Sequence, residues 1–170
     1  MTPEQLDEAQ REASEWRPRP SKISRRYTAN SLKSIGLVSN FSGVEVPLKM
    51  ERGTFVVPVE LNSAVKLDFT VDSGASDVTV PSDVFSTLKR TGTIKQSDIL
   101  PSQTYILADG SKSRSIRFKI RSLKVGDVVL NNVTASVSTS QGMLLLGQSF
   151  LSRFKSWSID NAKHELHLER

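Results

Sequence analysis

The chain has 170 residues, of which 37% are hydrophobic and 24% are charged, values typical of a globular domain that can bury a hydrophobic core. It has no cysteine, which excludes disulfides, zinc–thiolate centres and thiol catalysis. The net charge is +5, and no apolar run approaches the ~18–20 residues that a membrane-spanning helix needs.

The beginning of the chain divides into two segments of opposite charge. Residues 1–16 carry five acids and one base, and the run from Thr2 to Gln5 predicts the start of a polar helix. Residues 17–43 are predicted to be a basic linker, because Pro18 and Pro20 end the helix and residues 17–33 carry six bases and no acid. A basic run can attract nucleic acid, but no aromatic spacing accompanies this one, so we expect no nucleic-acid partner.

From Val44 onwards, the pattern changes to short strands separated by turns. One strand shows clean alternation, with Val65, Leu67, Phe69 and Val71 on one face. The strands are predicted at residues 44–50, 54–61, 64–71, 78–80, 104–108, 113–124, 127–138, 144–146, 156–160 and 164–169.

Two short helices are predicted among these strands. One begins at Ser82, as its N-cap, and ends near Leu88; the other covers residues 148–154. Many short strands with two small helices predict an all-β domain over residues 44–170, built as a closed barrel or a sandwich.

The tripeptide Asp72-Ser73-Gly74 directly follows the apolar strand that ends at Val71. Alone, such a tripeptide is usually a turn. Here the strand before it would hold the aspartate at the end of a rigid element. About 70 residues later, the run from Leu144 to Gly147 forms an apolar strand that ends in glycine before a short helix.

Together these features resemble the retropepsin-like aspartic proteases, and in particular their bacterial single-domain branch. The segments Leu146–Phe154 and Trp157–Asp160 are the most similar to that branch, and the resemblance covers about residues 44–170. It implies a retropepsin-like β-barrel and an aspartic-type endopeptidase that hydrolyses extended, largely apolar peptide segments. It implies no cofactor and no metal.

The resemblance also implies a homodimer. Two carboxylates ~3 Å apart share one proton and supply both the base and the acid for peptide hydrolysis. The chain has one Asp-Ser/Thr-Gly tripeptide, so Asp72 of each of two chains would contribute one carboxylate. By the same resemblance, the Ser73 hydroxyl hydrogen-bonds across the dimer axis. Gly74 lets backbone N–H groups approach the carboxylate, and Ala75 and Gly147 support the loop.

The residues Ala108, Asp109, Gly110 and Ser111 form a strong hairpin-turn signal, placed where this family has its flap. Such a flap closes over the substrate and excludes water. The alternative is a plain surface hairpin. Tyr105 either contacts substrate from the base of the flap or is a core or rim tyrosine.

Two further patterns concern charge and metal binding. Arg117, Lys119 and Arg121 form a basic row, which either favours acidic substrate flanks or is a solvated strand face. His164 and His167 lie three apart on a predicted strand and therefore on opposite faces, so the pair predicts no metal site.

Two expectations depend on the resemblance alone. Members of the bacterial branch are commonly envelope proteins, which implies a periplasmic or cell-envelope location, with any membrane association through a segment outside this sequence. The alternative function is a catalytically inactive retropepsin-like module that dimerises or binds a peptide.

Overall fold

The computed structural model describes residues 43–170, except residues 108, 140 and 141. The predicted helix over residues 1–16 and nearly all of the predicted linker over residues 17–43 lie outside the described residues. The description below therefore concerns the predicted all-β domain.

The described residues form eleven strands, two α-helices and one short 3₁₀ helix, which confirms the all-β prediction. The strands are β1 (Gly43–Pro47), β2 (Lys49–Glu51), β3 (Thr54–Leu61), β4 (Val65–Val71), β5 (Val78–Pro81), β6 (Ile99–Ile106), β7 (Lys112–Val125), β8 (Val128–Ser138), β9 (Leu145–Leu146), β10 (Ser156–Asp160) and β11 (Glu165–Glu169). The helices are α3 (Ser82–Arg90), η1 (Gln96–Asp98) and α4 (Gln148–Leu151).

The predicted cap of helix α3 is wrong. Ser82 is the first helical residue, and Pro81 occupies the N-cap position without a side-chain cap bond. Proline fits at this boundary because its φ of −58° is compatible with the helix that follows, although it also ends strand β5. Helix α3 extends to Arg90, and α4 is shorter than predicted. In the described part of the chain, neither helix has the length and apolar character of a membrane span.

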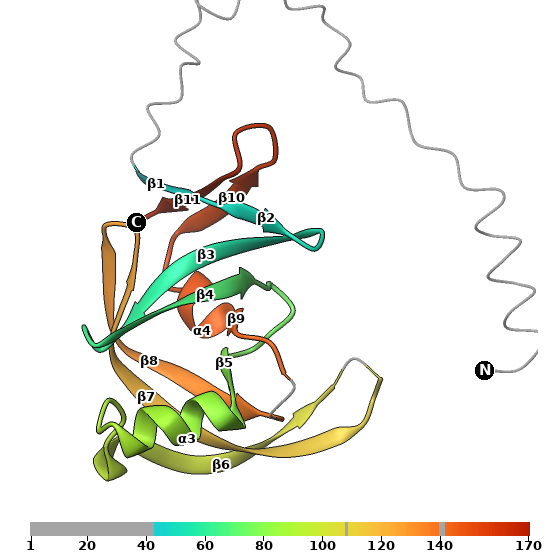
Figure 1. The fold of residues 1–170 in the computed structure, drawn as a ribbon. Coiled ribbons are helices and arrows are strands. Elements are labelled where there is room, and N and C mark those ends of the chain that lie inside the picture. The colour runs from blue at the N-terminus through green and yellow to red at the C-terminus, as the bar shows by residue number, and fades with distance from the viewer. Residues whose placement is uncertain (1–42, 108, 140–141) are drawn as a thin grey trace, which may run out of the picture. The chain divides into compact units, whose positions relative to one another are not determined.

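Six strands close into a barrel (Figure 1). The larger sheet has the order β2-β3-β4-β9-β5-β8-β7-β6, and β3 also pairs with β7, which joins the two sides of the sheet. Strand β9 lies between β4 and β5, although β4 and β5 are consecutive in the sequence. The loop that connects β4 to β5, residues 72–77, must therefore pass over the end of β9.

Apolar side chains fill the barrel. The alternation predicted along β4 is visible in its burial, with Phe69 completely buried and Lys66 and Asp68 exposed. Strand β9 contributes Leu146, which is also completely buried. Other large side chains with no exposed surface are Phe118, Phe150, Leu123 and Leu151.

A second, smaller sheet has the strand order β1-β11-β10 and is antiparallel throughout. Its inner face packs Val46, Leu166 and Leu168 into the core, each at most 2% exposed. Its outer face carries polar residues, among them Glu45 and His167, which lie directly opposite each other. This sheet joins the first described strand to the last one.

Gly147 lies directly beneath the loop that crosses β9. A Cβ atom at this position would come within 2.3 Å of the carbonyl oxygen of Asp77 and within 2.6 Å of that of Ala75. Both contacts are with backbone, so a longer side chain cannot simply turn away. The close stacking of the loop on β9 requires glycine here.

We predict that Gly147→Ala lowers the free energy of unfolding by ~1–3 kcal/mol or more, because the added methyl group overpacks the loop. Urea denaturation of the full chain measures this change. Gly74→Ala is the matched control: it adds the same methyl group to the loop, where the nearest atom is a carboxylate oxygen of Asp72 at 3.2 Å. A Gly147→Ala midpoint equal to that of wild type would show that the loop does not rest on this glycine.

Candidate functional site

Asp72 is the first residue after β4, at the start of the loop that crosses β9. Its backbone N–H donates to the carbonyl oxygen of Leu146 at 3.2 Å, which extends the parallel pairing of β4 with β9. Its Oδ1 accepts a hydrogen bond from the backbone N–H of Gly74 at 2.8 Å. Asp72 is half-buried, whereas Ser73 and Gly74 are exposed. The carboxylate is therefore held by the barrel and still reachable from solvent.

The start of helix α4 holds this loop from below. The backbone N–H groups of Gln148 and Ser149 donate to the carbonyl oxygens of Ala75 and Ser76, at 2.8 and 3.0 Å. The side-chain amide of Gln148 donates to the carbonyl oxygen of Ser73 at 2.8 Å. The first N–H groups of a helix have no partner within the helix, and here the loop supplies acceptors for two of them. The carbonyl groups of Ser73, Ala75 and Ser76 are thereby fixed.

The hydroxyl of Ser149 joins three elements. It accepts a hydrogen bond from the backbone N–H of Val78 at 2.9 Å and donates one to the carbonyl oxygen of Thr134 at 2.7 Å. These bonds connect α4 to the start of β5 and to β8. Sequence reasoning predicts no role for Gln148 or Ser149, although polar residues directly after a glycine at a helix start are a usable signal of a supporting contact.

A second carboxylate in the same loop, that of Asp77, bonds to the neighbouring hairpin. The Tyr105 hydroxyl donates to Asp77 Oδ2 at 2.5 Å, and Arg117 Nε lies 3.5 Å from the same oxygen. The Asp77 side chain is only 11% exposed. Tyr105 lies on β6 and Arg117 on β7, so both strands of the hairpin are tied to the loop that begins at Asp72. In the described structure, Tyr105 is a rim tyrosine bonded to this loop.

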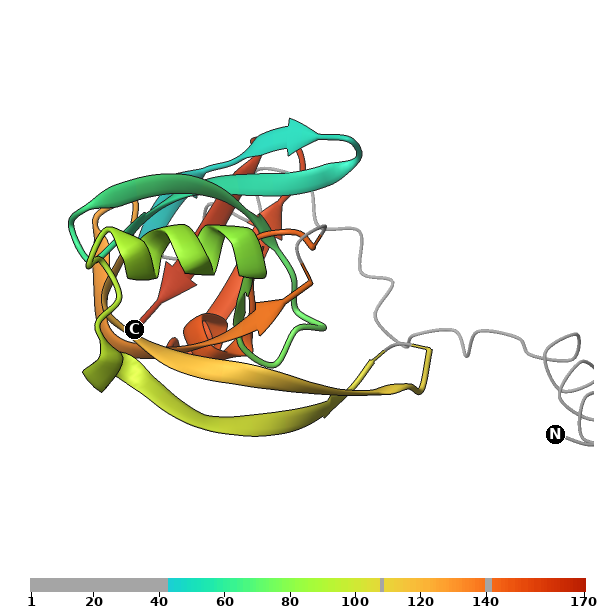
Figure 2. The same cartoon turned by 60° about the horizontal axis from the view of Figure 1, so that its bottom comes forward.

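The hairpin formed by β6 and β7 extends beyond the body of the barrel (Figure 2). At its tip, Asp109 Oδ1 accepts a hydrogen bond from the backbone N–H of Ser111 at 2.9 Å. Hydrogen bonds from the side chain and backbone of Ser111 lower the pKa of Asp109. Gly110 has a φ of +81°, which suits glycine. Ala108, the other predicted tip residue, lies outside the described residues.

Exposed apolar side chains gather on the same hairpin. Ile106 is 75% exposed, Leu107 is 48% exposed and Ile116 is 45% exposed. Soluble domains bury most residues of this size, so the three exposed side chains make this hairpin a candidate contact for an apolar ligand.

The basic row on β7 is largely engaged within the chain. Arg117 pairs with Asp77, and Arg121 forms an ion pair with Asp98, whose side chain is 4% exposed. Two of the three cations in the row therefore have acidic partners of their own. This weakens the interpretation of the row as a surface for acidic substrates.

Comparisons with known proteins agree with this arrangement. The family model of the gag-polyprotein putative aspartyl proteases matches residues 57–153, more than half of the chain. The crystal structure of a retropepsin-like aspartic protease from Rickettsia conorii is similar, with 26% sequence identity and a TM-score of 0.56. That similarity covers 74% of this chain and 90% of the other. A search of curated proteins found no match. The stretch matched by the family model includes Asp72, the hairpin and Gly147.

We predict that Tyr105 ionises at unusually high pH. Burial, followed by the hydrogen bond to Asp77, raises the pKa of Tyr105 to about 12. Because the folded state favours the neutral phenol, this contribution to stability is present below pH 10 and is lost as the pH rises through about 12.

An ultraviolet absorbance titration of the Tyr27→Phe variant tests this, because Tyr105 is then the only tyrosine. Circular dichroism shows over which pH range the chain stays folded. Asp77→Asn should lower the pH midpoint of the Tyr105 titration, since it removes the carboxylate that accepts a hydrogen bond from the phenol. A Tyr105 midpoint near 10 in the folded protein would contradict the contact.

Proposed function

Because this chain belongs to the family of the gag-polyprotein putative aspartyl proteases, we propose that it is an aspartic endopeptidase in which Asp72 supplies the catalytic carboxylate. The observation that supports this proposal most strongly is the position of Asp72. It follows β4, its Oδ1 accepts a hydrogen bond from the N–H of Gly74, and the loop behind it is fixed by α4. The similar fold of the aspartic protease from Rickettsia conorii supports the same assignment.

The reaction needs two carboxyl groups. One, ionised, removes a proton from water as the water oxygen attacks the carbonyl carbon of the peptide. The other, protonated, gives its proton to the amide nitrogen of the substrate. The C–N bond then breaks and the amine leaves. Close carboxylates divide these roles because they cannot both be ionised at ordinary pH.

A second identical chain is the proposed source of the second carboxyl group. The other aspartate of the loop, Asp77, is bonded to Tyr105 and paired with Arg117, so it is committed to holding the hairpin. A two-fold homodimer places the same residue of both chains about one axis, which brings two Asp72 side chains together. Ser73, exposed beside Asp72, is then positioned to bond across that axis.

The proposed substrate is an extended, largely apolar peptide segment. The β6–β7 hairpin offers Ile106, Leu107 and Ile116 as exposed apolar contacts. An extended peptide also presents backbone groups at regular spacing, which a hairpin strand can pair with. Closure of such a hairpin over the substrate would exclude water other than the attacking molecule.

We predict that Asp72→Asn lowers peptidase activity at least about a hundredfold while the fold is retained, because an amide cannot act as a base or share a proton. The assay is cleavage of an unstructured protein, with and without a pepstatin-like inhibitor, and circular dichroism checks the fold.

Asp68→Asn is the matched control for this experiment. Asp68 lies on β4, the strand that precedes Asp72, is 44% exposed and makes one loose ion pair with Lys49 at 3.6 Å, so its variant should keep wild-type activity. Undiminished cleavage by folded Asp72→Asn would remove Asp72 from the mechanism. Absence of cleavage by wild type, across a range of unstructured substrates and pH, would favour the inactive peptide-binding module.

A further inference from the structure

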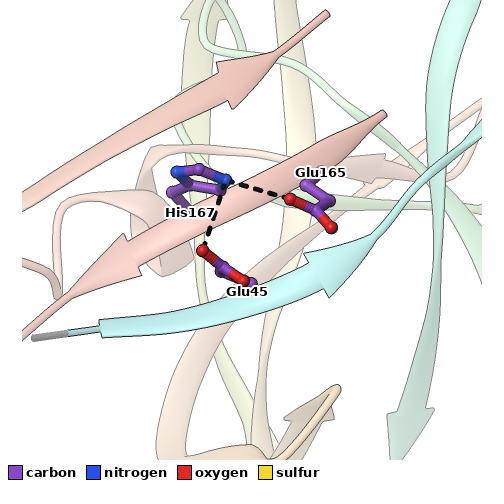
Figure 3. A group of neighbouring side chains, drawn as sticks. All are labelled: Glu45, Glu165 and His167. Atoms are coloured by element: carbon purple, nitrogen blue, oxygen red, sulfur yellow. Dashed lines mark hydrogen bonds and ion pairs between the residues drawn. The ribbon is translucent and has the colours of Figure 1, made fainter. Parts of the chain in front are cut away.

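Three possible metal ligands meet on the outer face of the small β1-β11-β10 sheet (Figure 3). Glu45 on β1 and His167 on β11 are directly opposite each other in the strand register. Glu165 precedes His167 by two residues on the same strand, so both side chains point to the same face. The backbone that carries the three residues is fixed by antiparallel pairing.

His167 makes long contacts with both carboxylates, one of them a hydrogen bond to Glu165. His167 Nε2 lies 3.4 Å from Glu165 Oε2 and 4.0 Å from Glu45 Oε1. Charge-assisted N–H···O bonds are usually about 2.7–2.9 Å long, and a single N–H cannot serve both carboxylates well. One imidazole nitrogen therefore faces two carboxylates at separations longer than good hydrogen bonds.

We propose that Glu45, Glu165 and His167 form a binding site for a divalent transition-metal ion, with Zn²⁺ the best fit. One imidazole nitrogen and two carboxylate oxygens are a donor set that zinc accepts, and the two negative charges balance those of the ion. The site is separate from Asp72 and takes no part in the proposed hydrolysis.

The observed separations are close to those that zinc requires. Zn–N and Zn–O bonds of about 2.0–2.2 Å place tetrahedral ligand atoms roughly 3.3–3.6 Å apart. The three ligand atoms here all lie within 4.8 Å of one another. Small side-chain rotations can bring the ligand atoms to the separations that zinc requires, because the Glu45 side chain is 50% exposed and has room to turn.

The charged groups around the site also bear on the ion. Lys163 Nζ lies 3.8 Å from Glu165 Oε2, but its side chain is 60% exposed and can move away when a cation binds. On β10, Ser158 lies opposite His167 and Asp160 lies opposite Glu165. Asp160 accepts hydrogen bonds from the backbone N–H groups of Ala162 and Lys163, which keeps its carboxylate in the turn, where it adds negative potential.

A bound ion would stabilise the attachment of β1 to the rest of the domain. Among the described residues, β1 has a single neighbouring strand, β11. Coordination by Glu45 from β1 and by Glu165 and His167 from β11 would add a direct link between the two strands. Metal binding should therefore stabilise the folded chain as well as occupy the site.

The two histidines give an internal control. His164 lies in the turn before β11 with a φ of +55°, and its ring contacts that of Phe55 at a centroid distance of 5.6 Å. The histidine pair alone predicted no metal site, and His164 is not one of the three ligands. The carboxylate from β1 could not be placed from the spacing of the histidines.

The test is calorimetric titration of the full chain with Zn²⁺ after treatment with a chelator. We expect one ion per chain, with affinity reduced at least about tenfold in His167→Ala and in Glu165→Gln, since even groups that only orient a ligand contribute that much. His164→Asn should bind zinc like wild type, because asparagine tolerates positive φ. Zinc should also raise the melting temperature of wild type and His164→Asn, but not that of His167→Ala.

The proposal would be overturned by the absence of zinc binding to wild type, or by binding that His167→Ala and Glu165→Gln leave unchanged. Glu45→Gln is a variant that should fold normally, since this half-exposed carboxylate is replaced by an amide of the same shape. A folded Glu45→Gln with wild-type affinity would show that β1 contributes no ligand and would also contradict the site.

Discussion

The position of the candidate site depends on one packing constraint, the passage of the 72–77 loop over the end of β9. Strand β9 is inserted between β4 and β5, so the loop has to cross it in direct contact. Gly147 permits that contact, because any Cβ there would collide with loop carbonyls. The contact in turn brings the N–H groups of α4 to the loop, and these fix the backbone behind Asp72. A clash at one glycine would therefore displace the proposed catalytic carboxylate.

The two aspartates of this loop show how environment divides roles between identical side chains. Asp77 is almost buried, hydrogen-bonded to Tyr105 and ion-paired with Arg117, so it anchors the hairpin. Asp72 is more accessible and has a backbone N–H as its donor in the described structure. The same loop thus holds a structural carboxylate and one available for chemistry. A site with one available carboxylate is incomplete for acid–base hydrolysis, which is why the proposed enzyme is a dimer.

Local pattern predicted much of this fold, and long-range contacts account for what it missed. The alternation of β4, the hairpin turn at Asp109 and Gly110, and the Asp72 tripeptide were all visible in the sequence, since each depends on neighbouring residues. The predicted N-cap of α3 is wrong by one residue. Serine is a strong capping signal, but Pro81 occupies the N-cap position and Ser82 is the first helical residue. The Asp77–Tyr105 bond joins residues 28 apart, and the Glu45–His167 pair joins the first strand to the last. No sequence period encodes such partners: the larger sheet brings the first pair together, and the small β1-β11-β10 sheet brings the second pair together.

Mixed-chain refolding tests the shared site most directly. Wild-type chains are unfolded with an equal amount of Asp72→Asn chains and refolded at a concentration that keeps the protein dimeric. Random pairing gives about one quarter wild-type dimers, because a two-fold interface does not distinguish the chains. Mixed dimers have one carboxylate, so our account predicts about one quarter of the activity of the same total amount of wild-type protein. Independent chains would retain about one half, and that result would contradict a site built from two Asp72 side chains.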